Sequence, residues 1–262
     1  MEISVLKQTD THLQLAVDGI DFVTVNTLRR LMVAEVPCLA IAEVEFQKNN
    51  SALYDEIVAH RLGLIPLKTD LKSYNVKEEC KCKGEGCALC QVEFSLDVAG
   101  PATVYAHDLQ CKDPAIIPVH GEMPIVKLLK GQRLKLTAVA VLDRGKTHMK
   151  FSPGWFYYQH YPEIKLGSHK NAEEIASVCP TRVFEVEGGK LKVRQLEKCI
   201  LCNACVDAAE PEGGVEVRGK KEKFLFFMES WGQLENKEIF LKALEIFDKK
   251  LNDFEKELKK AK

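Results

Sequence analysis

Several features that would assign a function directly are missing from this sequence. No apolar run approaches the length of a membrane-spanning helix, and the N-terminal residues lack the basic region and apolar core of a signal peptide. There is no glycine-rich fingerprint for flavin or nicotinamide binding, and no aspartate-rich metal motif. The formal net charge is only -1, so the composition does not indicate a protein that grips nucleic-acid phosphates. We therefore expect a cytoplasmic protein without membrane association and without direct sequence-specific contact with DNA.

The composition is that of a folded soluble chain, with 46% hydrophobic and 29% charged residues. Its 262 residues allow one large domain or two to three small ones. The sequence contains 10 cysteines, most of them clustered between Cys80 and Cys90 and between Cys199 and Cys205. Because reducing cytosol keeps thiols free, such clusters indicate metal binding rather than disulfides.

The first cysteine cluster predicts a structural zinc site. It contains a Cys-x-Cys pair and a Cys-x-x-Cys pair, formed by Cys80, Cys82, Cys87 and Cys90. Four thiolates at this spacing can surround one tetrahedral zinc, and the glycines between the pairs give the loop the freedom to wrap around it. The alternative is a set of reduced surface cysteines in a flexible loop. A thioredoxin-type redox role would need only one Cys-x-x-Cys pair, so the second pair argues against it.

The second cysteine cluster predicts an iron–sulfur site. Cys199, Cys202 and Cys205 recur every third residue, which is the spacing that wraps an iron–sulfur cube. Ferredoxin motifs continue with x-x-x-Cys-Pro, but this sequence has Ala209 at that position, and a Cys-Pro pair occurs upstream at Cys179. We therefore predict one cluster held by these four cysteines, in the 4Fe-4S form, or in the 3Fe-4S form if one thiolate does not bind. Zinc is the alternative metal.

A predicted helix near the N-terminus carries adjacent arginines. Leu28 lies on an apolar stripe of helical spacing, and Arg29 and Arg30 stand beside that stripe. We expect Thr24 or Asn26 to cap the helix, and proline at position 37 bars its continuation. Guanidinium groups suit a partner's carboxylates or carbonyls, so Asn26, Leu28, Arg29 and Arg30 are candidate interface residues. An amphipathic helix with solvated arginines is the alternative.

The chain ends in a second predicted helix with a sustained apolar seam. Its members are spaced 4, 3, 4, 3 and 4 residues apart, as in a heptad repeat, and are Phe240, Leu244, Phe247, Leu251, Phe254 and Leu258. We call these residues the terminal seam. The seam can dock on another subunit or pack on a sheet of this chain, and periodicity does not choose between these two.

The middle of the chain reads as strands. Short alternating runs separated by Gly-Pro, Asp-Pro and Lys-Gly turns predict a mainly β region over residues 91–141. Residues 183–193 predict a hairpin with a Gly-Gly turn, and short strands are expected at 215–217 and 224–227. The aromatic-rich residues 151–162 are interpreted as core or interface packing rather than as a surface that stacks on bases.

Taken together, these stretches resemble the D subunits of archaeal RNA polymerases, the counterparts of the bacterial alpha subunit. The resemblance covers nearly the whole chain and is carried by residues 25–30, 44–67, 124–128, 131–134 and 157–158. The cysteine motifs are variable in this family, so their assignment here depends on the spacing argument.

The resemblance implies an α+β fold in three parts. Residues 1–46 and 222–262 would form an alpha-like dimerisation domain, residues 47–164 a mainly β insert domain, and residues 165–221 a ferredoxin-like iron–sulfur domain. The chain would pair with the small subunit L through the Asn26–Arg30 helix and the terminal seam. That heterodimer would nucleate assembly with the small subunits N and P and with the large catalytic subunits.

Two functions follow from these readings. The first is a non-catalytic assembly subunit of DNA-directed RNA polymerase, a nucleotidyltransferase complex active in transcription, with a cluster domain that is structural or redox-regulatory. The second is a ferredoxin-like electron-transfer subunit of an oxidoreductase, which accounts only for residues 179–205. A single cluster without a second cluster or a flavin or nicotinamide site is poorly suited to electron transfer. We therefore favour the assembly subunit.

Overall fold

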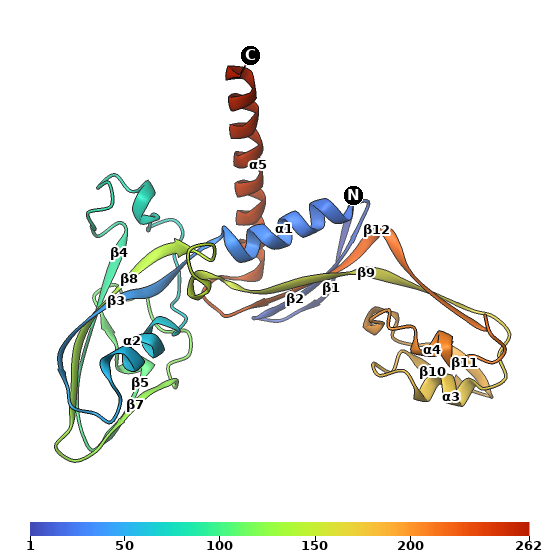
Figure 1. Ribbon diagram of the computed structural model, residues 1–262, viewed down its shortest axis with the longest axis horizontal. Helices are drawn as coiled ribbons and strands as arrows, with labels where there is room; N and C mark the ends of the chain where they lie inside the picture. Colours follow the sequence, from blue (N-terminus) through green and yellow to red (C-terminus); the bar gives the residue numbers. More distant parts are fainter. Residues whose placement is uncertain (262) are drawn as a thin grey trace. The chain divides into compact units, whose positions relative to one another are not determined.

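The computed structural model describes residues 1–261 and has the expected α+β composition (Figure 1). Its helices are α1 (Phe22–Ala34), α2 (Asp55–Gly63), α3 (Ala172–Ser177), α4 (Ala204–Asp207) and α5 (Asn236–Lys260). Its strands are β1 (Glu2–Gln8), β2 (His12–Asp18), β3 (Pro37–Asn49), β4 (Gln91–Ala99), β5 (Ala102–Tyr105), β6 (Gln110–Cys111), β7 (Pro124–Leu128), β8 (Arg133–Arg144), β9 (Gly154–Leu166), β10 (Phe184–Glu187), β11 (Lys190–Val193) and β12 (Val215–Ser230). None of these helices is long and apolar enough to cross a bilayer.

The chain divides into two compact units. The first unit combines residues 1–8, 13–26 and 157–227, and the second combines residues 9–12, 27–156 and the chain from Met228 onwards. Each unit is therefore assembled from segments that lie far apart in the sequence.

The first unit is built on a sheet with the strand order β1-β2-β12-β9. All side chains of β1 are exposed, as befits an edge strand, and β1 pairs antiparallel with β2. Inside the sheet, Phe224 of β12 is fully buried, with its ring edge-on to Tyr158 and close to His160 of β9. Burying a phenylalanine stabilises a fold by about 1.5–3 kcal/mol, so this contact helps to hold β9 and β12 together.

A small cysteine-containing region is inserted between β9 and β12. The backbone N–H of Gly167 donates to the carbonyl of Gly214 at 2.9 Å, so the insertion leaves and re-enters the strand pair at adjacent points. Inside it, β10 and β11 form the expected hairpin, with positive φ at both Gly188 and Gly189 as a tight hairpin turn requires. Helix α3 and both strands pack around one core that includes Ile175, which is fully buried.

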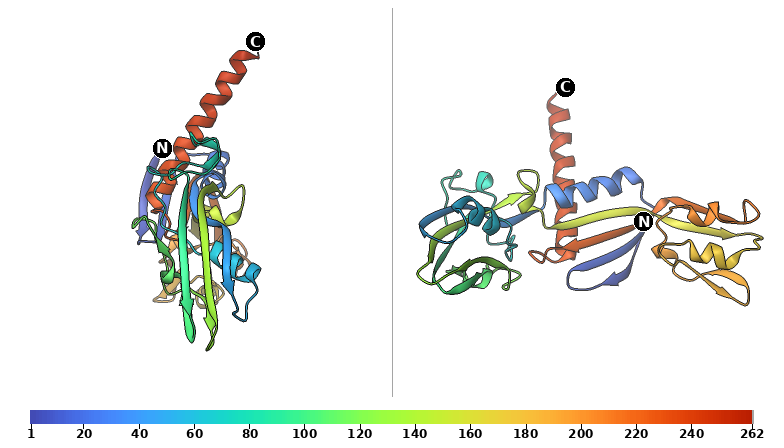
Figure 2. Two further views of the ribbon diagram at one scale, coloured as in Figure 1. Left: turned by 90° about the vertical axis from the view of Figure 1, so that its left-hand side faces the viewer. Right: turned by 60° about the horizontal axis from the view of Figure 1, so that its bottom comes forward.

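The second unit contains the sheet β3-β8-β4-β6, in which long antiparallel strands lie side by side (Figures 1 and 2). Short strands β5 and β7 pair separately. Alternate residues of β8 and β4, such as Leu136 and Phe94, face a core that also buries Val58 and Leu62 of α2. Helix α2 thus covers one face of the sheet.

Helix α1 begins earlier than its pattern predicts. It starts at Phe22, and Asp21 accepts hydrogen bonds from the backbone N–H and the hydroxyl of Thr24. The expected cap at Thr24 or Asn26 was therefore wrong, because the aspartate supplies a stronger acceptor one turn earlier. The helix ends at Ala34, shortly before Pro37, as expected.

Strands run through all three of the boundaries that we expected between domains. Residue 46 lies inside β3, residue 164 inside β9 and residue 221 inside β12. Each pair of neighbouring predicted domains is thus joined by a continuous strand. The division into residues 1–46 plus 222–262, 47–164 and 165–221 stays a prediction.

Candidate metal centres and partner surface

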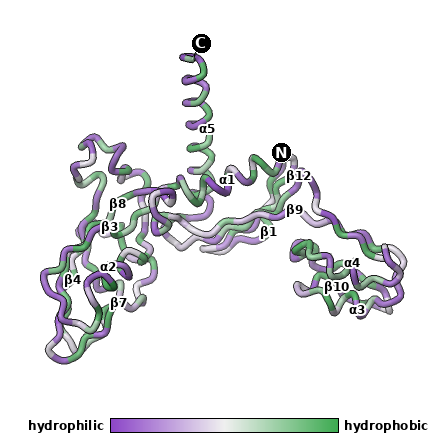
Figure 3. The backbone as a smooth tube through the Cα atoms, viewed as in Figure 1, coloured by the Kyte–Doolittle hydropathy of each residue, from purple (hydrophilic) through white to green (hydrophobic). Residues whose placement is uncertain are grey.

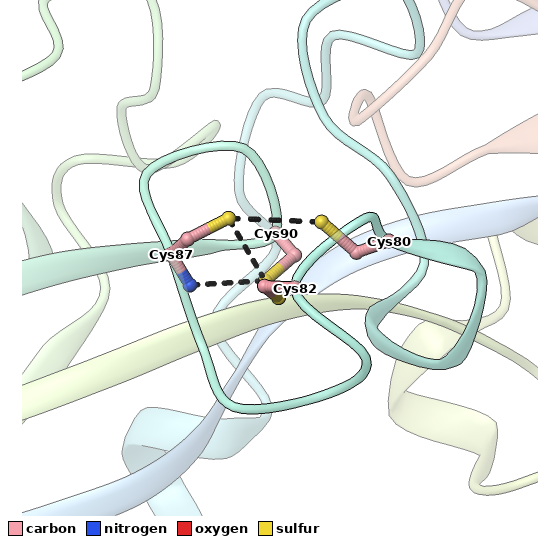
Figure 4. A group of neighbouring side chains, drawn as sticks. All are labelled: Cys80, Cys82, Cys87 and Cys90. Atoms are coloured by element: carbon pink, nitrogen blue, oxygen red, sulfur yellow. Dashed lines mark hydrogen bonds between the residues drawn. The ribbon is translucent and has the colours of Figure 1, made fainter.

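The four-cysteine loop, residues 80–90, brings its four sulfur atoms together (Figure 4). The sulfurs of Cys80 and Cys87 are 3.6 Å apart, those of Cys82 and Cys90 3.6 Å, and those of Cys87 and Cys90 3.8 Å. A tetrahedral ion with zinc–sulfur bonds of ~2.3 Å would separate its sulfur ligands by ~3.8 Å. The geometry of the loop therefore fits a single four-coordinate ion.

The backbone of this loop supports that arrangement. Lys83, Gly84 and Gly86 have positive φ, which turns the chain tightly between the two cysteine pairs. The N–H of Cys87 donates to the sulfur of Cys90 at 3.2 Å. Such N–H···S bonds stabilise thiolates, which are the form that binds metal.

Thiol protonation in the loop is uneven. Backbone hydrogen bonds, from Gly86 above all, lower the pKa of the Cys82 thiol to about 6. Burial raises the pKa of the Cys90 thiol to about 12. A bound divalent cation would deprotonate both thiols, because a coordinating thiol loses its proton outright. The charge of the ion would compensate the buried thiolate of Cys90. The donor set of four sulfurs leaves no open position, so such an ion would be structural.

The second predicted ligand set consists of Cys179, Cys199, Cys202 and Cys205. Cys179, Cys199 and Cys205 are buried in one common core, and Cys202 is exposed. Burial raises the pKa of the Cys199 and Cys205 thiols, and negative charge on Cys179 and Cys202 adds to both shifts. The structure thus brings these four cysteines into one neighbourhood.

These sulfurs are more widely spaced than those of the four-cysteine loop. No three of them lie within 4.8 Å of one another, in contrast to the sulfurs of residues 80–90. Ligands that bind separate iron atoms of a cube need a wider spacing than ligands of a single ion. These four thiols therefore do not have the single-ion spacing found in residues 80–90.

The segment that carries this second set is held by specific contacts. Leu201 and Asn203 adopt positive φ, which folds the chain between Cys199 and Cys205. From β9, the amide of Gln159 donates to the carbonyl of Cys199 at 3.2 Å. The N–H of Val183 donates to the sulfur of Cys179 at 3.3 Å. The sheet therefore positions the ligand loop through β9.

The predicted interface residues of α1 differ in exposure. Leu28 is only 7% exposed and belongs to the protein core, whereas Arg30 is exposed. Asn26 and Arg29 are half-buried. At the start of the helix, Phe22 and Val23 are 59% and 58% exposed, although the apolar pattern alone did not single them out.

The terminal seam divides into a half-buried and an exposed part. Helix α5 is anchored at its first turns by Asn236, Ile239 and Ala243, which are buried. Phe240, Leu244 and Phe247 of the seam are half-buried. Leu251, Phe254 and Leu258 are 51%, 64% and 52% exposed, respectively. Hydrophobic and hydrophilic residues continue to alternate along this exposed half (Figure 3).

The sequence did not predict one set of charged residues that the structure brings together. Glu35, Glu79, Arg144 and Lys250 form a chain of ion pairs, although they come from four separate segments. No local pattern marks them, because the pairs join residues 65 to 215 positions apart. Only the folded backbone reveals them.

Comparison with known proteins covers almost the whole chain. Residues 44–155 match the family model of the RNA polymerase Rpb3/RpoA insert domain. The chain is 34% identical over 262 residues to DNA-directed RNA polymerase subunit Rpo3 of Methanosphaera stadtmanae, covering 97% of each chain. It is 36% identical to subunit Rpo3 of Archaeoglobus fulgidus, again over 97% of each chain. It is 35% identical to DNA-directed RNA polymerase II subunit rpb3 of Dictyostelium discoideum, covering 97% of this chain and 93% of that one.

Proposed function

The chain belongs to the archaeal and eukaryotic Rpo3/Rpb3 family of DNA-directed RNA polymerase subunits, and from this premise we propose that it is a non-catalytic, alpha-like assembly subunit. The polymerase is a nucleotidyltransferase, but this subunit is not catalytic alone. An electron-transfer role is not favoured, because the similarity to polymerase subunits extends over almost the entire chain and not only over the second cysteine set.

The exposed half of the terminal seam supports a proposal for how the subunit binds its partner. Leu251, Phe254 and Leu258 present large apolar side chains on one face of a helix, and burying each of them would contribute roughly 1–3 kcal/mol. We propose that this seam, together with Asn26, Arg29 and Arg30 of α1, binds the small alpha-like subunit L. Subunits N and P and the large catalytic subunits would then join this heterodimer.

Co-expression tests the assembly role. The full chain, carrying an affinity tag, is produced anaerobically together with the small alpha-like subunit and, separately, with all polymerase subunits. We expect a stable complex with the small subunit in equal amounts, and recovery of the large subunits only when the small subunit is present. Recovery of the large subunits without any small subunit would contradict the proposed order of assembly.

We further propose that Cys80, Cys82, Cys87 and Cys90 hold one structural zinc. The sulfur spacing in the loop and its closed, four-thiol donor set support this assignment. Elemental analysis of the purified chain tests it: we expect one zinc per chain, lost together with loop structure when one ligand is replaced. Absence of zinc from protein purified without chelators would overturn the assignment.

We also propose that Cys179, Cys199, Cys202 and Cys205 hold one iron–sulfur cluster, in the 4Fe-4S form in preference to 3Fe-4S. The cluster would tie Cys179 to the segment of residues 199–205 inside the inserted region and so give it a structural or redox-regulatory role. Iron and sulfide analysis with electron paramagnetic resonance, all under anaerobic conditions, distinguishes the two forms. Zinc in place of iron in anaerobically prepared protein would favour the alternative metal.

The remaining parts of the proposal concern organisation and location. The alpha-like dimerisation domain, the insert domain and the ferredoxin-like domain remain our proposed division of the chain. A cytoplasmic location and the absence of direct sequence-specific DNA contact also stay predictions, which subunit-specific crosslinking to DNA and cell fractionation would test.

A further inference from the structure

A chain of ion pairs in the second unit connects the four-cysteine loop to helix α5. The Nζ of Lys250 in α5 lies 2.9 Å from one carboxylate oxygen of Glu35, which follows α1. The other oxygen of Glu35 lies 4.0 Å from the Nε of Arg144, at the end of β8. The Nη2 of Arg144 lies 2.5 Å from Glu79, the residue directly before Cys80.

The two central members of this chain are shielded from water. The side chains of Glu35 and Arg144 are only 17% and 26% exposed, whereas the outer members Glu79 and Lys250 are 55% and 52% exposed. Charges at a partly buried position interact more strongly than charges on an open surface, because solvent screens them less. The central pair therefore couples its two outer partners more effectively than surface ion pairs would.

Arg144 is held in place by its backbone. A Cβ atom on the next residue, Gly145, would lie only 2.1 Å from the carbonyl oxygen of Val33, so the chain passes directly against the end of α1. The N–H of Lys146 donates to the carbonyl of Ala34 at 2.9 Å. These backbone contacts fix the end of β8 beside Glu35. From there the guanidinium group of Arg144 reaches Glu79, next to the four-cysteine loop.

A cavity lies beside these ion pairs, between the start of the four-cysteine loop and helix α5. Its volume is about 550 Å³, and its lining includes the charged residues Glu35, Glu79 and Arg144 together with six residues of α5: Lys242, Glu245, Ile246, Lys249, Lys250 and Asp253. The ion pairs of Glu79, Arg144, Glu35 and Lys250 join the two sides at the edge of this cavity, so this link depends on their charged side chains.

Lys250 lies at a position on α5 where an ion pair can set the direction of the helix. The buried anchors of the helix end at Ala243, and residues 251–260 are all exposed. Lys250 thus lies where the helix departs from the unit, about 10 Å beyond the last buried anchor at 1.5 Å per residue. A contact at this place fixes the direction of the exposed half of the terminal seam.

We propose that Arg144 and Glu35 are positioning residues that transmit the state of the four-cysteine loop to helix α5. When the loop holds its metal, Glu79 is fixed beside Arg144, and the ion-pair chain keeps α5 in the direction its partner needs. When the loop is empty, Glu79 is released and the helix direction becomes variable. This inference rests on the proposed zinc site and on the proposed role of the terminal seam.

Hydrogen exchange of the isolated full chain tests the link without any partner. In the unaltered chain, removing zinc with a chelator is expected to speed the exchange of the amides of residues 244–250 about three-fold, the size expected for one partly exposed ion pair. In Arg144→Met the exchange is fast from the start, and the chelator adds nothing to it. Arg133→Met is the matched control, because it removes an exposed ion pair with Asp97 at the other end of β8.

A double-mutant cycle tests the same chain independently of metal. Glu79→Gln and Lys250→Met remove the two outer charges, which do not contact each other. Their effects on α5 exchange should be non-additive when Arg144 is present and additive in Arg144→Met. Additive effects in both backgrounds, or an equal response of α5 to chelator with and without Arg144, would overturn the inference.

These outcomes are separable from failure of the proposed function. If the chain binds no zinc, the metal assignment fails while the cycle still measures the ion-pair chain. If zinc is bound and the small subunit assembles normally, but the cycle is additive, only the positioning role fails. By linkage, a positive result also requires the small subunit to tighten zinc binding by the factor by which zinc tightens subunit binding.

Discussion

Replacing Phe254 by alanine tests the proposed partner surface quantitatively. A phenylalanine buries about 150–250 Å², and the side chain of Phe254 is 64% exposed, so roughly 100–160 Å² remains for a partner to cover. At about 25 cal/mol per Å² this area corresponds to roughly 2.5–4 kcal/mol, of which alanine keeps a part. We expect the variant to lose about 2–3 kcal/mol of association free energy, a fall in affinity of about 30- to 150-fold.

The same substitution should leave the isolated chain almost unchanged. The side chain is exposed, so the free energy of unfolding is expected to shift by less than about 0.5 kcal/mol. Ile239→Ala, at the fully buried base of the same helix, should instead destabilise the isolated chain by about 2–5 kcal/mol. This contrast separates a docking residue from a folding residue on one helix.

Titration calorimetry with the purified small alpha-like subunit measures the affinities, and thermal unfolding of each variant measures stability. Leu241→Ala is the matched control, because Leu241 is 50% exposed on α5 but lies about 100° around the helix from the seam. The reasoning is refuted if Phe254→Ala binds within two-fold of the unaltered chain, or if Leu241→Ala weakens binding as strongly.

Three further predictions concern the metal centres and pH. Cys87→Ser should abolish stoichiometric zinc binding and leave iron content unchanged, as measured by elemental analysis of the two metals side by side. Cys202→Ser should remove the visible absorption of the 4Fe-4S form or convert it to the 3Fe-4S signal, while Cys38→Ser, which alters a fully buried lone thiol, should keep cluster content. Burial, followed by the charge of Glu235, raises the pKa of Glu238 above its usual range, so the folded state binds more protons than the unfolded state between the two pKa values. Stability contributed by this group therefore rises as pH falls through that window, and Glu238→Gln should stabilise the chain at neutral pH and flatten this part of the profile in denaturant titrations.

Residue spacing predicted the features that depend on local geometry. Heptad spacing located α5 and its seam, because a helix of 3.6 residues per turn leaves little choice of face. Thiol spacing in residues 80–90 predicted the meeting of four sulfurs that the folded loop displays. What spacing could not decide was which half of the seam stays exposed, since Ile239 and Ala243 on a neighbouring stripe make the buried contact.

Strand continuity and long-range charge pairing lay beyond the sequence. We expected short strands at 215–217 and 224–227, but β12 runs unbroken from Val215 to Ser230. Residues 218–222 in its middle are all exposed, so both faces of the strand meet water there and no apolar alternation marks this part as a strand. The pairing of Arg144 with Glu79 likewise depends on how β8 ends against α1, which no local pattern encodes.

The way the cysteine-containing region joins the sheet has a consequence for how such chains can vary. Because Gly167 and Gly214 are hydrogen-bonded neighbours, the 46 residues from 168 to 213 form a cassette whose two ends meet. A chain in which a tight turn replaces this cassette should retain the β9–β12 pairing, as amide exchange along both strands would reveal. The four cysteines of this region can accordingly be lost from such a chain while the strand pair that carries the region persists.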